Sequence, residues 1–414
     1  MKKIVASLLI TLFCLSLAAC EKQPFRRAEV VLGDAVALSV AAKGSKAKTA
    51  VNEMFALAND VFGEMNLSEK DSLLTRFNAD DSVRPCEITE HIFNTLILAK
   101  TAWEKSNGAF DVTSLPLSRL WRVDTAGLHS LRPDINDLNG SAADAEKLPT
   151  KEQVKETLQY VGMDKLEFYE ESGKYYLKKT DGRVQIDLGG IAKGYFVDLC
   201  KGIAEKYSLE SCLIDLSGNL YLYGGGLKSG GDWTVGIKNP RPRLTYSEAL
   251  RDYVAAVSTA GNRSYVTGGD YQRFYYARYK DVVSEAQLLA VCHIINPKSG
   301  LPVGIKYDEE TNRYETDYDA VCMAVVSAQN SALCDAYTTA VAVLGLQEGA
   351  KLLKDNGFDG LIFTNPDLKY DEESYPPSED GPTPTKKGRG KMKTVGSWRF
   401  TDGYDNYKTD YEAV

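Results

Sequence analysis

Residues 187–195 carry the clearest signal for chemistry in this chain. They read Asp-Leu-Gly-Gly-Ile-Ala-Lys-Gly-Tyr and place two glycines between a predicted strand end and a predicted helix start. Such a junction presents backbone N–H groups and the positive end of a helix to an anion such as phosphate. The stretch is not a P-loop, because Tyr195 stands where that motif requires Lys, and the dinucleotide G-x-G-x-x-G spacing is absent. A phosphate site and a plain tight turn both fit the pattern.

Asp335 and Thr339 form a second candidate constellation. They lie four residues apart in a predicted helix, so their oxygens project from the same face. Magnesium prefers oxygen ligands, commonly one or two from protein together with phosphates and water. The pair therefore predicts a metal site, and a helix cap or an internal hydrogen bond from Thr339 is the alternative.

His293 is the third candidate. It ends a predicted strand just before residues 297–300, a Pro-Lys-Ser-Gly turn. A general base or a phosphate donor would be placed in such a position, and a structural histidine is the alternative. His91 and His129 have no comparable setting, and we interpret them as structural or surface residues.

The elements that must position these residues follow from periodicity and turn residues. The predicted helices cover residues 48–62, 89–106, 150–160, 191–206, 331–344 and 350–356. The predicted strands cover residues 29–41, two short segments within 166–177, and residues 184–188, 212–215, 220–223, 233–237, 360–364 and 397–400. Residues 124–147 are predicted to form a long surface loop. Hairpin strands mixed with long helices indicate an α+β fold rather than a regular βαβ winding.

The first twenty residues differ from the rest of the chain. Two lysines precede an apolar run at 4–17, and a Leu-Ala-Ala-Cys sequence ends at Cys20. This pattern is typical of a bacterial lipoprotein signal, in which the cysteine is lipidated and anchors the chain to a membrane. An ordinary secretory signal is the alternative. We therefore predict a signal peptide at 1–19, a tether at 20–28 and a lipid-anchored location on the periplasmic face of a bacterial membrane.

Composition limits the partners of the remaining chain. The net charge of −8 becomes −10 when the two signal-peptide lysines are removed, and basic residues cluster only at 386–393. Nucleic acid is therefore not an expected partner. The six cysteines outside residues 1–20 show no C-x-x-C spacing, so a zinc site is not indicated, and buried thiols and disulfides are both compatible with the sequence.

These segments together resemble the ApbE family, the FAD:protein FMN transferases, in their order and spacing. The matching segments are residues 72–78, 108–113, 187–195, 217–219, 259–262, 293–300 and 335–339. The resemblance covers roughly residues 30–365, and 187–195 is its specific part. We therefore expect a transferase domain at 29–365 and an irregular extension at 366–414 that ends in a short strand.

The resemblance implies a two-lobed α+β fold with antiparallel sheets and packed helices, and with the FAD site between the lobes. The residues implied to contact FAD are Ala109, Phe110, Asp111, Gly189, Gly190, Lys193, Thr259 and His293. The residues implied to bind Mg²⁺ are Asp335, Thr339 and Gly190, the last through a backbone carbonyl.

The resemblance also implies a reaction. A Thr or Ser hydroxyl of an acceptor protein attacks the FMN-side phosphorus of FAD, and AMP leaves. Mg²⁺, Lys193 and the amides of the glycine turn would stabilise the developing charge. His293 is the first candidate for taking the hydroxyl proton and Asp187 the second, although Asp187 fits equally a structural cap of the turn that follows it. The implied acceptor is a subunit of a membrane respiratory complex.

Three other functions use some of the same parts. A hydrolase would use water as the nucleophile and give FMN and AMP. A non-catalytic FAD-binding lipoprotein would need the pocket but not the metal pair. A redox flavoenzyme is the third alternative, and the sequence contains no dinucleotide motif for its reductant.

The sequence departs from the family pattern at three places. Residues 66–68, Asn-Leu-Ser, stand where family members often carry an aromatic residue that stacks on adenine. The interval between Asn262 and Cys292 is longer than usual, and Asn296 stands where Asp is frequent.

Overall fold

The computed structural model describes most of the chain. The described residues are 23–32, 36–124, 142–228, 231–240, 253–281, 288–364, 392–401 and 412–413. The predictions that concern Cys20, His129 and most of the loop at 124–147 lie outside these ranges.

A nine-stranded sheet forms the centre of the molecule, with strand order β1-β2-β7-β8-β11-β16-β17-β18-β19. The strands are β1 (Phe25–Leu32), β2 (Val36–Lys43), β7 (Ser211–Leu216), β8 (Asn219–Gly224), β11 (Arg263–Gly269), β16 (Val321–Ala328), β17 (Asp359–Thr364), β18 (Met392–Val395) and β19 (Glu412–Ala413). Neighbouring strands are antiparallel except for β18 and β19, which are parallel. The antiparallel α+β class predicted from the sequence is confirmed.

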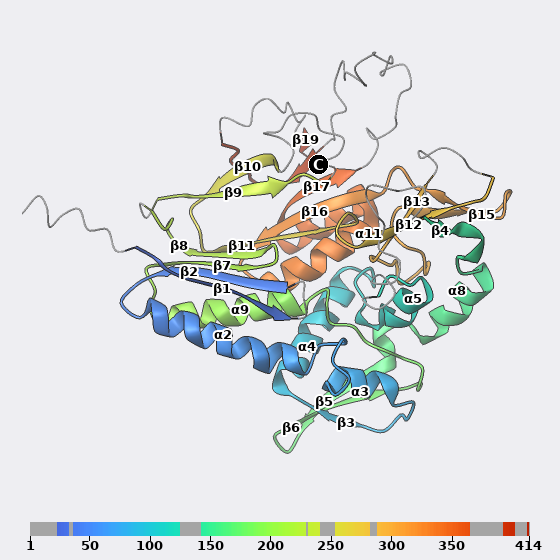
Figure 1. Ribbon diagram of the computed structural model, residues 1–414, viewed down its shortest axis with the longest axis horizontal. Coiled ribbons are helices and arrows are strands. Elements are labelled where there is room, and N and C mark those ends of the chain that lie inside the picture. The colour runs from blue at the N-terminus through green and yellow to red at the C-terminus, as the bar shows by residue number, and fades with distance from the viewer. Residues whose placement is uncertain are drawn as a thin grey trace, which may run out of the picture.

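The two faces of the sheet are covered differently (Figure 1). Helices α2 (Ala47–Gly63), α9 (Ala192–Lys206) and α11 (Ser331–Asn356) pack on one face, and the hairpin of β9 (Trp233–Lys238) and β10 (Tyr253–Thr259) packs on the other. Side chains alternate between the faces, as the period of a strand requires. In β11, Val266 joins the helical core while its neighbour Tyr265 joins the core under the hairpin.

Smaller elements complete the fold. Around the helical core lie α3 (Leu73–Ala79), α4 (Glu90–Lys105), β3 (Cys86–Ile88), β5 (Leu166–Glu171) and β6 (Lys174–Lys179). A separate core around Trp121, Tyr275 and Tyr314 joins α5 (Leu115–Leu120), α8 (Lys151–Thr157), β4 (Ala143–Asp144), β12 (Phe274–Arg278), β13 (Leu289–Cys292), β14 (Ile305–Asp308) and β15 (Arg313–Thr316). Among the residues described, no helix is both long and apolar enough to cross a membrane.

The start of the chain corrects two predictions. The strand predicted at 29–41 is a hairpin of β1 and β2, and the tether predicted at 20–28 ends sooner because β1 begins at Phe25. Arg27 lies over the Phe55 ring at 4.2 Å and pairs with Glu29 at 2.8 Å. β1 is an edge strand that exposes most of its residues, so polar side chains are tolerated in it. These polar residues are the reason why the sequence pattern did not predict a separate strand there.

The end of the chain corrects two more predictions. The last strand predicted at 397–400 is wrong: β18 lies at 392–395 and pairs with β17, and Phe400 forms only an isolated bridge with Val257. The extension at 366–414 therefore contributes strands to the central sheet.

The two helices predicted at 331–344 and 350–356 lie within α11, whose interior is interrupted at Gly345 (φ 77°, ψ −175°).

Residues 184–188 are not the predicted strand. Their backbone pairs with a side chain instead: Ile186 N–H donates to Asn78 Oδ1, and Asn78 Nδ2 donates to the Ile186 carbonyl, both at 2.8 Å. The next residue, Asp187, donates its N–H to the Val112 carbonyl at 2.8 Å. An isolated side chain thus replaces the partner strand, which the alternation of apolar residues does not reveal.

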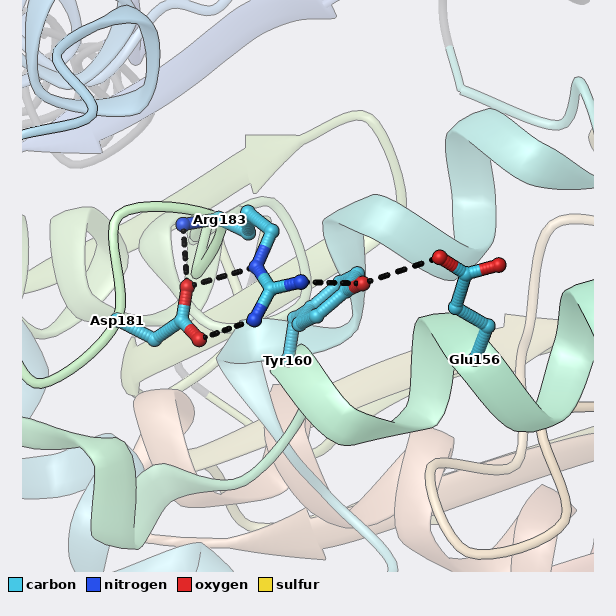
Figure 2. Close-up of polar contacts among 4 residues, drawn as sticks. All are labelled: Glu156, Tyr160, Asp181 and Arg183. Atoms are coloured by element: carbon cyan, nitrogen blue, oxygen red, sulfur yellow. Dashed lines mark hydrogen bonds and ion pairs between the residues drawn. The ribbon is translucent and has the colours of Figure 1, made fainter.

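The turn that leads into this segment is tied to the end of α8 (Figure 2). Arg183 donates to both carboxylate oxygens of Asp181 at 3.0 and 2.7 Å, and its guanidinium lies 3.9 Å from the centre of the Tyr160 ring. The Arg183 hydrogen bonds lower the pKa of Asp181 to about 2. Exposed ion pairs of this kind add little to the free energy of unfolding. The network therefore helps to set the position of the turn and does not hold the fold together.

The cysteines in the described residues are free thiols. Cys200, Cys212, Cys292, Cys322 and Cys334 are buried, and Cys86 is half-buried. Of the two states compatible with the sequence, the structure contains the thiol form.

Candidate active site

The predicted glycine turn opens α9 as expected. The Leu188 carbonyl accepts from the N–H groups of Ile191 and Ala192 at 3.0 and 2.8 Å, and α9 then begins at Ala192. Asp187 Oδ1 accepts from Gly189 N–H at 2.7 Å. Asp187 therefore does cap the turn, which is the structural role left open for it, and its part in proton transfer stays a prediction.

Asp335 lies against this turn, on the first part of α11. Its side chain is buried, and Oδ2 accepts from the Gly194 N–H at 3.1 Å. The Lys193 ammonium lies 3.5 Å from Asp335 Oδ1 and donates to the Gly189 carbonyl at 3.1 Å. Burial raises the pKa of Asp335, and the charge of Lys193 opposes that rise. The structure thus brings together three predicted site residues that lie up to 146 positions apart, from Gly189 to Asp335.

Thr339 lies one turn further along α11 and is partly exposed. A side chain added at Gly190 would place its Cβ 3.7 Å from Thr339 Oγ1 and 3.1 Å from Phe110 Cε2. The Gly190 turn therefore sits between the predicted metal ligand and the predicted FAD segment. The adjacent Thr338 is buried and donates to the Asp335 carbonyl at 2.7 Å, so its hydroxyl is used within the helix.

The oxygen groups gathered here fit Mg²⁺. A carboxylate, a hydroxyl and nearby backbone carbonyls are the hard donors this ion prefers, and it commonly completes its coordination with phosphate and water. Asn219, at the start of β8, lies close enough to lower the pKa of Asp335.

His293 is held as a neutral imidazole. Its Nδ1 lies 3.1 Å from the Arg273 carbonyl, and because a carbonyl only accepts, Nδ1 carries the proton and Nε2 keeps a free lone pair. His293 is partly accessible to solvent, but the protein packed around its ring desolvates it and lowers its pKa to about 3, and the charges of Arg273 and Lys193 act in the same direction. His293 therefore stands within electrostatic reach of Lys193, in the tautomer that a general base requires.

The predicted FAD segment borders a cavity. Ala109 and Phe110 are buried, and Asp111 lines a space of about 330 Å³. The cavity is lined by Trp103, Glu104, Asn107, Gly108, Asp111, Val161, Gly162, Pro297 and Lys298. It thus joins two sequence segments of the predicted site, 108–113 and 293–300.

Asp111 also has a structural task. Its carboxylate accepts from Thr113 N–H at 2.8 Å and from Met163 N–H at 3.0 Å, and it caps the short 3₁₀ helix at Val112–Ser114. Burial raises the pKa of Asp111, and these hydrogen bonds oppose the rise. The Asp111 carboxylate therefore holds the wall of the cavity in place, independently of any contact with a ligand.

Thr259 is not brought to this group of residues. It pairs with Trp233 at the end of β10, and the nearby Asn262 accepts from Gly224 N–H at 3.0 Å, at the end of β8 opposite to Asn219. Asn262 lies six positions before Gly268, where β11 meets α11, which is roughly 20 Å of strand. Its contact with the flavin nucleotide stays a prediction.

A sequence similar to residues 259–262 lies further along β11, where the strand meets α11. Residues 267–270 read Thr-Gly-Gly-Asp, and a Cβ at Gly268 would be 2.4 Å from Thr338 Oγ1. The absent side chain lets β11 approach α11 beside Asp335. The sequence carried one signal of this, because the interval that ends at Cys292 is unusually long. Counting that interval from Thr267 instead of Thr259 shortens it by eight residues.

Of the two histidines interpreted as structural or surface residues, His91 lies in the described part of the chain and makes a structural contact. His91 Nδ1 lies 3.1 Å from the Tyr195 hydroxyl and joins α4 to α9.

Comparisons with known proteins all point to one family. A family model described as "ApbE family" matches residues 32–362. The FAD:protein FMN transferase of Haemophilus influenzae is 26% identical over 362 residues, which cover 86% of this chain and 91% of that protein. The protein of the same name from Treponema pallidum is 26% identical over 357 residues, which cover 83% and 85%.

Solved structures share the fold. The flavin transferase ApbE of Vibrio cholerae matches with a TM-score of 0.60 at 20% identity and covers 93% of this chain and 99% of its own. The apo flavinyl transferase ApbE of Pseudomonas stutzeri matches with a TM-score of 0.63 at 19% identity and covers 93% and 97%.

Proposed function

The chain belongs to the ApbE family, and from this membership we infer that it is an FAD:protein FMN transferase. The observation that carries the inference is the meeting of the Gly189–Gly190 turn, Lys193 and the buried Asp335. A cation and a buried carboxylate at one helix start are suited to a diphosphate and a hard metal ion. The relatives named FAD:protein FMN transferase support the same reaction.

We propose that the acceptor is a Thr or Ser hydroxyl. Its oxygen bonds to the FMN-side phosphorus, the bond from that phosphorus to the AMP oxygen breaks, and AMP leaves with the electron pair. His293 Nε2 takes the hydroxyl proton, since its Nδ1 is already committed to the Arg273 carbonyl. Lys193 stabilises charge on the phosphoryl oxygens, whereas the N–H groups of Gly189, Ile191 and Ala192 donate within the turn itself.

Mg²⁺ belongs to the same proposal. Asp335, Thr339 and the Gly190 carbonyl would hold it, and when bound it would neutralise charge on the diphosphate. The segment Ala109–Asp111, with the cavity beside it, would bind another part of FAD.

The first test mixes the full chain with FAD, Mg²⁺ and a candidate acceptor domain from a membrane respiratory complex. We expect flavin fluorescence on the denatured acceptor together with one free AMP for each flavin attached. FMN and AMP without a labelled acceptor would instead identify an FAD hydrolase. Intact bound FAD in every condition would leave only a flavin-binding protein.

We also propose that Cys20 is lipidated and holds the enzyme at the periplasmic face of a bacterial membrane. The support is the lysine pair, the apolar run at 4–17 and the Leu-Ala-Ala-Cys sequence. A Cys20→Ser variant is expected to lose incorporation of a labelled fatty acid and to leave the membrane fraction. Full labelling of this variant would contradict the proposal.

A further inference from the structure

Asp198 holds the first turn of α11 from outside that helix. It lies on α9, and its two oxygens accept from the N–H groups of Ser331 and Ala332, both at 2.9 Å. A helix start leaves such N–H groups without an internal partner. The following Leu333 N–H is satisfied at 2.7 Å by the side chain of Asn330, the N-cap residue. The first three N–H groups of α11 are therefore paired, two of them by one carboxylate.

The contact is reciprocal. Asp335 of α11 accepts from the Gly194 N–H in the first turn of α9 at 3.1 Å. Asp198 lies four residues after Gly194, and Asp335 lies four residues after Ser331. Each helix thus presents a carboxylate from its first two turns to the start of the other. The positive ends of both helices favour these negative groups.

Backbone contact fixes the distance between the two helices. A Cβ at Gly194 would lie 2.2 Å from the Ser331 carbonyl oxygen and 2.7 Å from the Ala332 Cα. Ser331 and Ala332 are fully buried. Because both sides of this contact are backbone, a change in the capping of α11 cannot be absorbed by a side-chain rotation and must shift the helix start.

A shift of the helix start reaches the metal site directly. Asp335 lies one turn into α11. Its Oδ1 faces the Lys193 ammonium, which also donates to the Gly189 carbonyl. The direction of this carboxylate relative to the glycine turn therefore depends on how the first turn of α11 is held. Hydrogen-bond partners behind a metal ligand typically change metal affinity by about 10- to 100-fold when they are mutated.

We propose that Asp198 is a positioning residue for Mg²⁺ binding: by capping α11 it sets Asp335 against the Gly189–Gly190 turn. Asp198 does not itself reach the metal or the substrate. The proposal rests on the metal site proposed above, and it adds a residue that acts through Asp335.

The test measures binding of Mn²⁺ and Mg²⁺ to the full chain in the presence of FAD, by electron paramagnetic resonance and by calorimetry. Asp198→Ala is expected to weaken metal binding by about 10- to 100-fold. Asp198→Asn keeps one side-chain oxygen as an acceptor but points its amide protons at the other backbone N–H. Its metal affinity should therefore lie between those of wild type and Asp198→Ala. In transfer assays the KM for Mg²⁺ should rise by a similar factor, while kcat at saturating Mg²⁺ changes little.

A matched control separates positioning from stability. Leu353→Ala removes a fully buried side chain near the far end of α11, beyond the interruption at Gly345. It should lower Tm, as Leu-to-Ala changes in cores do, and leave the metal affinity at the wild-type value. If Asp198→Ala does not fold, Asp198→Asn carries the comparison.

Two outcomes overturn the proposal in different ways. Equal metal affinity in wild type and in folded Asp198 variants would overturn the positioning role and leave the transferase function intact. A wild-type chain that binds neither Mn²⁺ nor Mg²⁺ with FAD would overturn the metal site, and the role of Asp198 with it.

Discussion

Replacing Asp335 by alanine is expected to lower kcat/KM for covalent flavin transfer by about 10³-fold or more. The change removes the buried carboxylate that faces Lys193 and the glycine turn, and with it the proposed metal ligand. A bound metal ion supplies several kcal/mol of charge stabilisation in a transition state, and each 1.36 kcal/mol is about tenfold in rate. The measurement is the initial rate at which fluorescence appears on the denatured acceptor.

Asp335→Asn distinguishes lost charge from lost structure. Its side-chain oxygen can still accept from Gly194 N–H, so Tm should stay closer to wild type than in Asp335→Ala, which leaves that N–H without its partner. We expect the asparagine variant to be nearly as inactive as the alanine variant. Activity within tenfold of wild type in Asp335→Asn would rule out an essential metal carboxylate at this position.

Asp355→Ala is the control on the same helix. Asp355 is exposed near the end of α11 and pairs with Lys351, four residues before it. Such a surface pair contributes at most about 1 kcal/mol. The variant should therefore keep wild-type transfer rates and nearly wild-type stability, so that a loss in Asp335→Ala reports the site rather than the helix.

Much of the fold could be predicted because it follows short-range patterns. The glycine turn, the start of α9 and the hairpin of β7 and β8 were visible as local periodicity and turn residues. Edge strand β1 was misjudged because Arg26, Arg27 and Glu29 break the apolar pattern that a buried strand would show. Residues 184–188 were misjudged because their pairing partner is the side chain of Asn78, 108 positions earlier than Ile186.

The site was predictable to the extent that each segment carries its own motif. Asp335, Lys193 and the glycine turn lie together as expected. The distance of Thr259 from these residues depended on sheet register, since β11 must run past β8 before it meets α11. The role of Asp198 has no local signature at all, because its partners at the start of α11 lie 133 and 134 positions away.

Replacing His293 by asparagine is expected to lower the transfer rate by about 10²- to 10⁴-fold, the usual effect of losing a general base. Asparagine can donate from Nδ2 to the Arg273 carbonyl, as the imidazole Nδ1 does, but it offers no basic nitrogen at the Nε2 position. The loss should appear in kcat for acceptor labelling, with FAD binding little changed. Fluorescence titration with FAD provides that second measurement.

The same variant makes the stability of the protein less sensitive to acid. The pKa of His293 is lowered from 6.5 to about 3, mainly by burial, so the unfolded chain binds a proton at this residue at pH values where the folded chain does not. The stability that the neutral imidazole contributes is therefore fully present above pH 6.5 and is lost as the pH falls from 6.5 toward 3. His293→Asn lacks this group, so the unfolding free energy of wild type relative to the variant should decrease over that interval.

Urea unfolding of both proteins at several pH values between about 7.5 and 4.5 tests this expectation, since the difference between two curves cancels the carboxylates they share. A difference that falls steadily with pH would show that the imidazole is buried and neutral in the folded enzyme, which is the state a general base must have before it takes a proton. A difference that stays constant would mean that His293 titrates as it does in the unfolded chain. Such an imidazole would still be mostly neutral above pH 7 and able to take a proton, so the general-base role would then rest on the loss of kcat in His293→Asn alone.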